Sequence, residues 1–115
     1  MRRAGNDGAF AAVRAMGLAL PGVEAAIKYD GSPVLKRGGR FMAGLALHPS
    51  AEPGTLVVRA DLEERDAMIA DAPETYYLTD HYRPHPVILV RLSAIDREAL
   101  RDVLSMTWRL TARPR

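Results

Sequence analysis

The feature that most restricts the fold of this chain is a pair of adjacent glycines, Gly38 and Gly39, between two extended segments. A two-residue loop of this kind favours a primed hairpin turn, because both central residues take positive φ. The extended segments around it are residues 24–29, 33–37 and 40–47. With a second turn at Asp30-Gly31, they predict an antiparallel meander.

Helical spacing of apolar residues predicts three helices, capped at their N-termini by Asp7, Asp61 and Asp96. The remaining extended segments are residues 55–60, 75–79 and 87–92, of which 75–79 is short. The expected order is helix, four strands, helix, strand, helix. This order indicates an α+β fold, with an antiparallel sheet of about five strands and the first and third helices packed on one face. The other face is expected to be solvated.

Composition is that of an ordinary globular protein, with 48% hydrophobic and 26% charged residues in 115. This length fits one domain over residues 1–115. The lack of cysteine excludes disulfides, thiolate catalysis and cysteine-based zinc sites. The apolar run at residues 9–20 contains Arg14 and is too short to span a membrane. A cytoplasmic protein without a membrane partner is therefore expected.

Charge is unevenly distributed along the chain. Residues 1–60 carry eight Lys/Arg and four Asp/Glu, a net charge of +4, whereas residues 61–115 carry eight and ten, a net charge of −2. Six of those acidic residues lie between Asp61 and Glu74, with one arginine among them. The second helix is therefore expected to be a solvated acidic surface that repels DNA.

The hairpin concentrates positive charge. A two-residue turn places Arg37 opposite Arg40 and Leu35 opposite Met42, with Lys36 nearby. Two like charges facing each other cost up to about 1 kcal/mol, which a bound phosphate would relieve. The alternative interpretation is that these charges keep an exposed strand edge from pairing with other chains.

A second polar cluster precedes the last strand. Its side chains are Asp80, His81, Tyr82, Arg83 and His85. His81 and His85 have the spacing of metal ligands on a helix, but the neighbouring prolines disfavour a helix and a third ligand is not evident. No metal or cofactor is expected. Tyr82 could stack on a base and Arg83 could bind a phosphate; alternatively, Tyr82 packs inward in an ordinary surface loop.

Catalytic motifs are not found in the sequence. The two glycines of the hairpin do not open a helix as a phosphate-binding loop does, and no serine lies in a nucleophile elbow. A non-enzymatic protein is therefore expected. Five aromatic residues are predicted to be core or partly buried rather than a stacking surface: Tyr29, Phe41, Tyr76, Tyr77 and Trp108.

Six segments follow one another along the chain: LALPGVE (18–24), GGRFMA (38–43), YYLT (76–79), HYR (81–83), VILVRL (87–92) and the final helix with SMTWRL (105–110). Together they resemble the MmcQ/YjbR family. The resemblance implies a small bacterial α+β domain with a CyaY-like (frataxin-like) fold and DNA binding through a double-wing arrangement. The hairpin at residues 36–40 would match one wing, and the loop around Tyr82 would lie near another contact.

The function predicted from the sequence is weak, largely phosphate-directed DNA binding by a monomer or weak dimer. The residues expected to bind nucleic acid are Lys36, Arg37, Arg40 and Arg83, with His81, Tyr82 and His85 available for a ligand or for stacking. The alternative is a module that binds a protein or a small molecule through the outer face of the sheet. The residues expected on that face are Leu35, Met42, Ala46, Val57 and Leu89.

Overall fold

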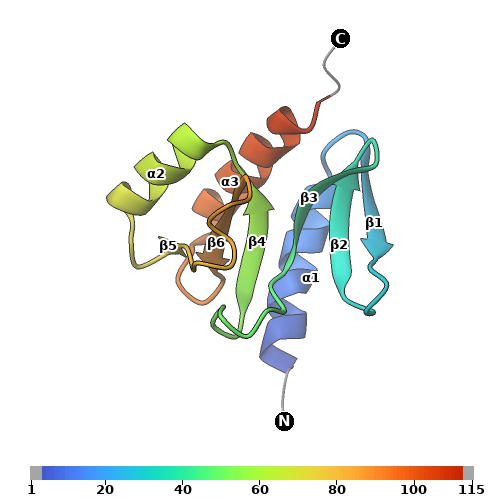
Figure 1. Ribbon diagram of the computed structural model, residues 1–115. Helices are drawn as coiled ribbons and strands as arrows, with labels where there is room; N and C mark the ends of the chain where they lie inside the picture. Colours follow the sequence, from blue (N-terminus) through green and yellow to red (C-terminus); the bar gives the residue numbers. More distant parts are fainter. Residues whose placement is uncertain (1–3, 113–115) are drawn as a thin grey trace.

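The computed structural model describes residues 4–112, so both ends of the expected domain, residues 1–3 and 113–115, lie outside the described residues. Three helices and six strands follow one another along this part of the chain (Figure 1). They are α1 (Ala4–Leu18), β1 (Val23–Ile27), β2 (Pro33–Arg37), β3 (Arg40–Leu45), β4 (Thr55–Arg59), α2 (Leu62–Asp71), β5 (Tyr76–Tyr77), β6 (Val87–Arg91) and α3 (Arg97–Leu110).

All six strands form one antiparallel sheet in the order β1-β2-β3-β4-β6-β5. The predicted α+β class is confirmed, and the sheet has one strand more than the five expected. The extra strand is β5, whose Tyr76 and Tyr77 pair with Val90 and Leu89 of β6. Because only these two residues pair, β5 gives a weak strand signal in the sequence.

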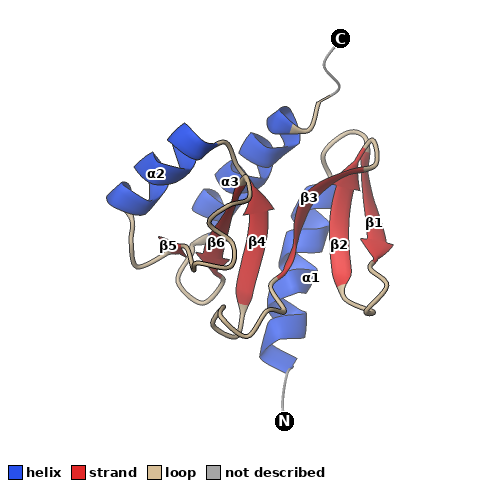
Figure 2. Ribbon diagram, viewed as in Figure 1, coloured by secondary structure: helices blue, strands red, loops and turns tan. Residues whose placement is uncertain are grey.

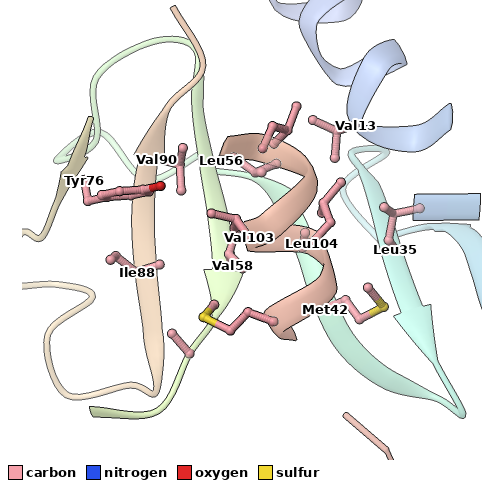
Figure 3. Packing of buried hydrophobic residues seen from close by; sticks show 14 of the residues in the cluster. Val13, Leu35, Met42, Leu56, Val58, Tyr76, Ile88, Val90, Val103 and Leu104 are labelled. Atoms are coloured by element: carbon pink, nitrogen blue, oxygen red, sulfur yellow. The ribbon is translucent and has the colours of Figure 1, made fainter. Parts of the chain in front are cut away.

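α1 and α3 lie on one face of the sheet, behind the strands in the view of Figure 2. α1 packs near β1, α3 packs on β3 and β4, and α2 lies beside β5 and β6 at one edge. α1 approaches β2 closely, since a Cβ at Gly17 would overlap Cδ1 of Leu35. Completely buried side chains fill the space between helices and sheet (Figure 3): Val13, Leu35, Met42, Leu56, Val58, Ile88, Val90 and Leu104. The predicted packing of α1 and α3 on one face is thus confirmed.

Local side-chain chemistry sets the start of two helices. The Asp61 carboxylate accepts a hydrogen bond of 2.9 Å from the Glu64 N–H, and Asp96 accepts one of 2.8 Å from the Ala99 N–H. Both predicted N-caps are therefore confirmed. The predicted cap Asp7 is wrong, because α1 already begins at Ala4 and continues through that residue. Of the helices within residues 4–112, none combines the length and hydropathy needed to cross a membrane.

The glycine hairpin forms as predicted. Gly38 and Gly39 have φ values of 58° and 81°, the positive angles that a primed two-residue turn requires. Arg37 and Arg40 are paired across it, also as predicted. A side chain at either glycine would strain the turn, since other residues rarely adopt these angles.

The predicted register holds for the pair next to the arginines and fails at the pair after it. Lys36 pairs with Phe41 but Leu35 pairs with Ala43, so Met42 is an extra residue, a β-bulge, in β3. Met42 lies in the helix-side core with no exposed surface. The predicted pairing of Leu35 with Met42 is therefore wrong. Because the bulge shifts the alternation of side chains, Phe41 lies on the face opposite the helices.

Arg37 is committed to the folded structure. Its Nη1 donates a 2.5 Å hydrogen bond to the Trp108 carbonyl oxygen, and its guanidinium lies 4.1 Å from the centre of the Trp108 ring. The indole in turn donates from Nε1 to the Pro21 carbonyl, 2.8 Å away. Arg37 thus joins β2 to the C-terminal end of α3. This contact also relieves the repulsion from Arg40, for which the sequence suggested a bound phosphate.

Replacement of Arg37 by alanine is expected to lower the free energy of unfolding by about 1–3 kcal/mol, because a charge-assisted hydrogen bond and a cation–π contact are lost together. Urea unfolding followed by circular dichroism measures the change. Arg40→Ala is the matched control and should change stability by no more than about 0.5 kcal/mol. Equal losses in the two variants would contradict the assigned role of Arg37.

Candidate nucleic-acid interface

The sheet face opposite the helices, here called the open face, is apolar across its middle. A continuous row of paired residues crosses it: Ala26, Val34, Gly44, Val57, Leu89 and Tyr77. Two loops, residues 46–54 and 78–86, cover the half formed by β4 and β6, and the second passes in front of these strands in Figure 1. They bury Val57 and Leu89. The half formed by β1 to β3 is not covered by them.

The two covering loops are tied to each other. Ser50 Oγ lies 2.9 Å from Thr79 Oγ1, and the rings of His48 and His81 stack at 3.5 Å with an interplanar angle of 9°. Tyr82 meets the His81 ring edge-on at a centroid distance of 4.8 Å. His48 is distant in sequence from the polar cluster at residues 80–85, and the fold brings it into direct contact with that cluster.

The loop at residues 46–54 is also fixed to the sheet through Tyr77. The Tyr77 hydroxyl lies 2.6 Å from Thr55 Oγ1 and accepts a 2.9 Å hydrogen bond from the Glu52 N–H. Arg91 stacks on the Tyr77 ring at 4.1 Å and makes two hydrogen bonds of 2.9 Å to the Glu52 carboxylate. The Arg91 hydrogen bond holds the pKa of Glu52 below its usual value. Arg91 and Tyr77 are therefore engaged within the protein.

A buried arginine anchors the loop at residues 78–86. Arg65 of α2 is 7% exposed, and its Nη1 donates to the carbonyl oxygens of Arg83, His85 and Val87 at 3.3, 2.9 and 3.2 Å. The predicted acidic surface of α2 therefore contains one cation that points inward. Its three acceptors hold the backbone leading into β6 in place.

A groove of about 490 Å³ lies on the open face between the covering loops and the turn after β1. Its lining residues come from both sides of that gap: Lys28, Tyr29, Phe41, Leu45, Leu47, His48, Pro49, Val57, His81 and Tyr82. Phe41 also lies above Gly44, where a Cβ would be 3.4 Å from Cε1 of the ring. Tyr29 is fully exposed at 101%. Aromatic rings thus line both sides of the groove.

Cations flank Phe41 on the open face. Lys36 pairs with Phe41 across β2 and β3, and Arg59 of β4 donates from Nε to the Phe41 carbonyl at 3.0 Å. Arg59 also pairs with Val87, the first residue after the covering loop. One acidic residue, Glu24, pairs with Lys36 from β1. The positive charge on this face therefore runs across β2, β3 and β4.

The residues predicted for nucleic-acid binding are divided between the two faces. Lys36 lies on the open face, whereas Arg37 is engaged with α3 and its cross-strand partner Arg40 shares that side of the hairpin. Arg83 is exposed at the rim, 3.9 Å from Asp80. The guanidinium of Arg37 already has a carbonyl and a ring as partners, and its contribution to phosphate binding stays a prediction.

The residues predicted for ligand contact or stacking are largely brought together. His81 and Tyr82 line the groove, and the His85 ring lies 6.5 Å from His81. Phe41 is half-buried, as predicted, but it lies on the open face. The expected burial of Tyr29 is wrong, because its side chain is fully exposed. Tyr76 belongs to the core as predicted.

The surface predicted for the alternative function is not a continuous exposed face. Leu35 and Met42 lie in the helix-side core, and Val57 and Leu89 are buried beneath the covering loops. Ala46 alone among the five is partly exposed. Leu35 stands two positions before Arg37 on β2 and shares the helix side with it, so the sequence assigned the two faces of this strand the wrong way round.

The histidine cluster has limited chemical capacity. His48 Nδ1 lies 2.9 Å from Ser50 Oγ and accepts a 3.1 Å hydrogen bond from the Ser50 N–H, the geometry of a local turn. A serine and a base are thus adjacent, but no carboxylate in the described part of the chain hydrogen-bonds to His48. Within residues 4–112, no three metal-ligating side chains converge on one point.

Sequence reasoning missed several residues of this site. They are Lys28, Tyr29, Phe41, His48, Arg59 and Arg65. The sequence contains a signal for Arg59, because this residue stands two positions after Val57 on β4 and therefore lies on the same open face. For Arg65, an isolated arginine in an acidic helix is a weaker signal, since exposed ion pairing gives the same pattern.

Replacement of Arg65 by methionine is expected to lower the free energy of unfolding by about 1–3 kcal/mol, because three carbonyl oxygens lose their common donor. Amide hydrogen exchange should become faster at residues 80–87 than in β4. Arg97→Met, on an exposed residue of α3, is the control and should leave both quantities nearly unchanged. Unchanged exchange at residues 80–87 in Arg65→Met would contradict the anchoring role.

The pKa of His81 lies below its usual value near 6.5. The main cause is the loss of hydration where the ring packs against its neighbours, and electrostatic repulsion from His48 and His85 contributes less. Since the folded state has the lower pKa, its contribution to stability is present above pH 6.5 and is lost as the pH falls through the folded-state pKa. An NMR titration of the ring protons should give a pKa under 6.5 in the wild type. In His48→Gln the value should rise; an unchanged value would contradict coupling through the stack.

Comparison with known proteins identifies a family for this chain. Residues 18–110 match the family model described as YjbR. A 46-residue segment, 40% of this chain, is 37% identical to the uncharacterized proteins Mb2600 of Mycobacterium bovis and Rv2570 of Mycobacterium tuberculosis, and it spans only 36% of their length. The crystal structure of Deinococcus radiodurans protein DR2400, with a domain described as DUF419, has a TM-score of 0.68 and 20% identity, covering 85% of this chain and 74% of that one.

At 20% identity, the likeness to the Deinococcus protein concerns the fold alone. The family match is more extensive, since it starts at the end of α1 and reaches the end of α3. It includes every strand, both covering loops and the glycine hairpin, in agreement with the resemblance noted in the sequence. This protein therefore belongs to the YjbR family.

Proposed function

We propose that this protein binds nucleic acid without catalysis, through the open face of the sheet. The observation that carries the proposal is the placement of Lys36 and Arg59 on either side of Phe41, next to the aromatic groove. Cations that contact phosphates beside rings that stack on bases are the usual combination for sequence-tolerant binding. The cytoplasmic location expected from the sequence remains a prediction.

The interface proposed here differs from the hairpin tip expected from the sequence. The guanidinium of Arg37 is engaged by Trp108, so phosphate contacts fall to Lys36, Arg59 and Arg83. The acidic residues of α2 belong to the helix layer and do not line the groove. The acidic residues near the open face are Glu24 beside Lys36, Asp80 beside Arg83, Glu52 paired with Arg91, and Asp30, whose carboxylate is hydrogen-bonded to Ser32.

Fluorescence anisotropy of labelled single-stranded and duplex DNA, between about 25 and 200 mM salt, tests this proposal. Three phosphate contacts predict a slope of log K against log [salt] of about −2 to −3, and a Kd in the non-specific range of about 10⁻⁴ to 10⁻⁶ M at physiological salt. Binding to neither form of DNA at the lowest salt would overturn the proposal.

The double variant Lys36→Gln/Arg59→Gln should weaken binding and reduce the salt slope by about 1–2, because two phosphate contacts are lost. Arg97→Gln/Arg101→Gln removes the same charge from exposed positions on α3, on the opposite side of the sheet. This control should keep most of the affinity and the slope. Equal weakening by both pairs would indicate an effect of net charge and contradict an interface on the open face.

A further inference from the structure

We infer that the groove between Tyr29 and the His81–Tyr82 loop accepts an unpaired nucleobase, which makes this protein a binder of single strands. The inference rests on the proposed function, because it assumes that the cations of the open face contact a nucleic-acid backbone. It names the form of nucleic acid, which the cations alone do not select, since phosphates are common to single strands and duplexes.

The lining of the groove supports a planar aromatic ligand. Tyr29 lies on one side, His81 and Tyr82 lie on the other, and Phe41 of β3 also lines the groove. Its volume of about 490 Å³ is within the range of small-ligand sites. Base stacking on such rings tolerates any sequence, because every base has a π-face.

The turn that carries Tyr29 is held in place. The Asp30 carboxylate accepts hydrogen bonds from the N–H and the hydroxyl of Ser32 at 3.0 and 2.6 Å, and the Lys28 N–H donates to the Ser32 carbonyl at 2.8 Å. The tyrosine ring is nevertheless fully exposed. An exposed ring on a fixed turn loses little conformational freedom when it stacks on a ligand, which favours binding.

The cations lie where a strand crossing the groove would place its phosphates. Lys36 pairs with Glu24 near one end of β1, and Lys28 follows the other end and lines the groove. At about 3.3 Å per residue, Glu24 and Lys28 are separated by about 13 Å along the strand. Phe41 connects the groove to the cations, since it lines the groove and is the cross-strand partner of Lys36.

A duplex fits this arrangement less well. Its bases are paired and stacked inside the helix, so one must be unpaired and turned outward before it can enter a groove of this size. The energetic cost is absent for a single strand. Single-stranded DNA should therefore bind more tightly than duplex DNA of equal phosphate number, although both meet the same cations.

The test compares three labelled probes at low salt: a 20-nucleotide oligo-dT, the same backbone with abasic sites throughout, and a duplex with the same number of phosphates. Oligo-dT should bind about 5- to 100-fold more tightly than the abasic strand, the range expected for one stacked base, and more tightly than the duplex. Tyr29→Ala should remove about the same factor for oligo-dT and leave the abasic probe unchanged.

Tyr29→Phe keeps the ring and should bind like the wild type. Ile27→Ala is the matched control for loss of an exposed apolar side chain, because Ile27 ends β1 two positions before Tyr29, is 70% exposed and does not contribute to the Tyr29–Tyr82 groove. Phe41→Leu provides a second loss of stacking that keeps an apolar group in place.

Equal affinity for all three probes, unaltered by Tyr29→Ala, would overturn the inference while leaving nucleic-acid binding intact. Failure of every probe to bind would overturn both.

Discussion

The two faces of the sheet differ because β3 contains one extra residue at Met42. Without that bulge, strict alternation would turn Phe41 toward the same side as Ala43. With it, Met42 and Ala43 both pack in the helix-side core, and Phe41 lies on the open face beside Lys36 and Arg59. The placement of Phe41 relative to Ala43 therefore depends on this single residue, whereas Lys36 and Arg59 take their faces from regular alternation along β2 and β4.

Arginine serves three structural purposes in this chain. Arg37 joins the hairpin to α3, Arg65 holds the backbone before β6, and Arg91 fixes the loop at residues 46–54 through Glu52 and Tyr77. Each guanidinium donates to carbonyls or to a carboxylate, although Nε of Arg65 is buried and has no hydrogen-bond partner among the described residues. The number of basic residues in the sequence therefore overstates the charge available to a ligand, and the open face depends on a smaller set.

The features that were predictable from the sequence are those decided by neighbouring residues. The glycine hairpin, the Asp61 and Asp96 caps and the α+β order depend on turn geometry, capping and periodicity, and these signals lie within a few residues. The polar cluster that contains His81 and Tyr82 was also predictable, because its residue types are unusual for a loop.

The remaining features depend on contacts between distant segments. Arg37 and Trp108 are separated by 71 positions, so no local pattern indicates that they stack. Their contact, like the stacking of His48 on His81, exists only once the sheet is assembled. The surroundings of the bulge also include a contact between distant segments, since Met42 packs in the helix-side core and its carbonyl accepts a 3.3 Å hydrogen bond from Thr107 of α3.

Trp108 gives this arrangement an optical consequence. It is the only tryptophan in the chain and lies on the helix side, in contact with Arg37 and Pro21. A ligand on the open face is separated from it by the thickness of the sheet, whereas Tyr29 and Tyr82 line the groove itself. Indole emission therefore reports on the integrity of the helix layer from a position away from the groove, whereas phenol emission combines Tyr29 and Tyr82 with Tyr76 and Tyr77, which do not line it.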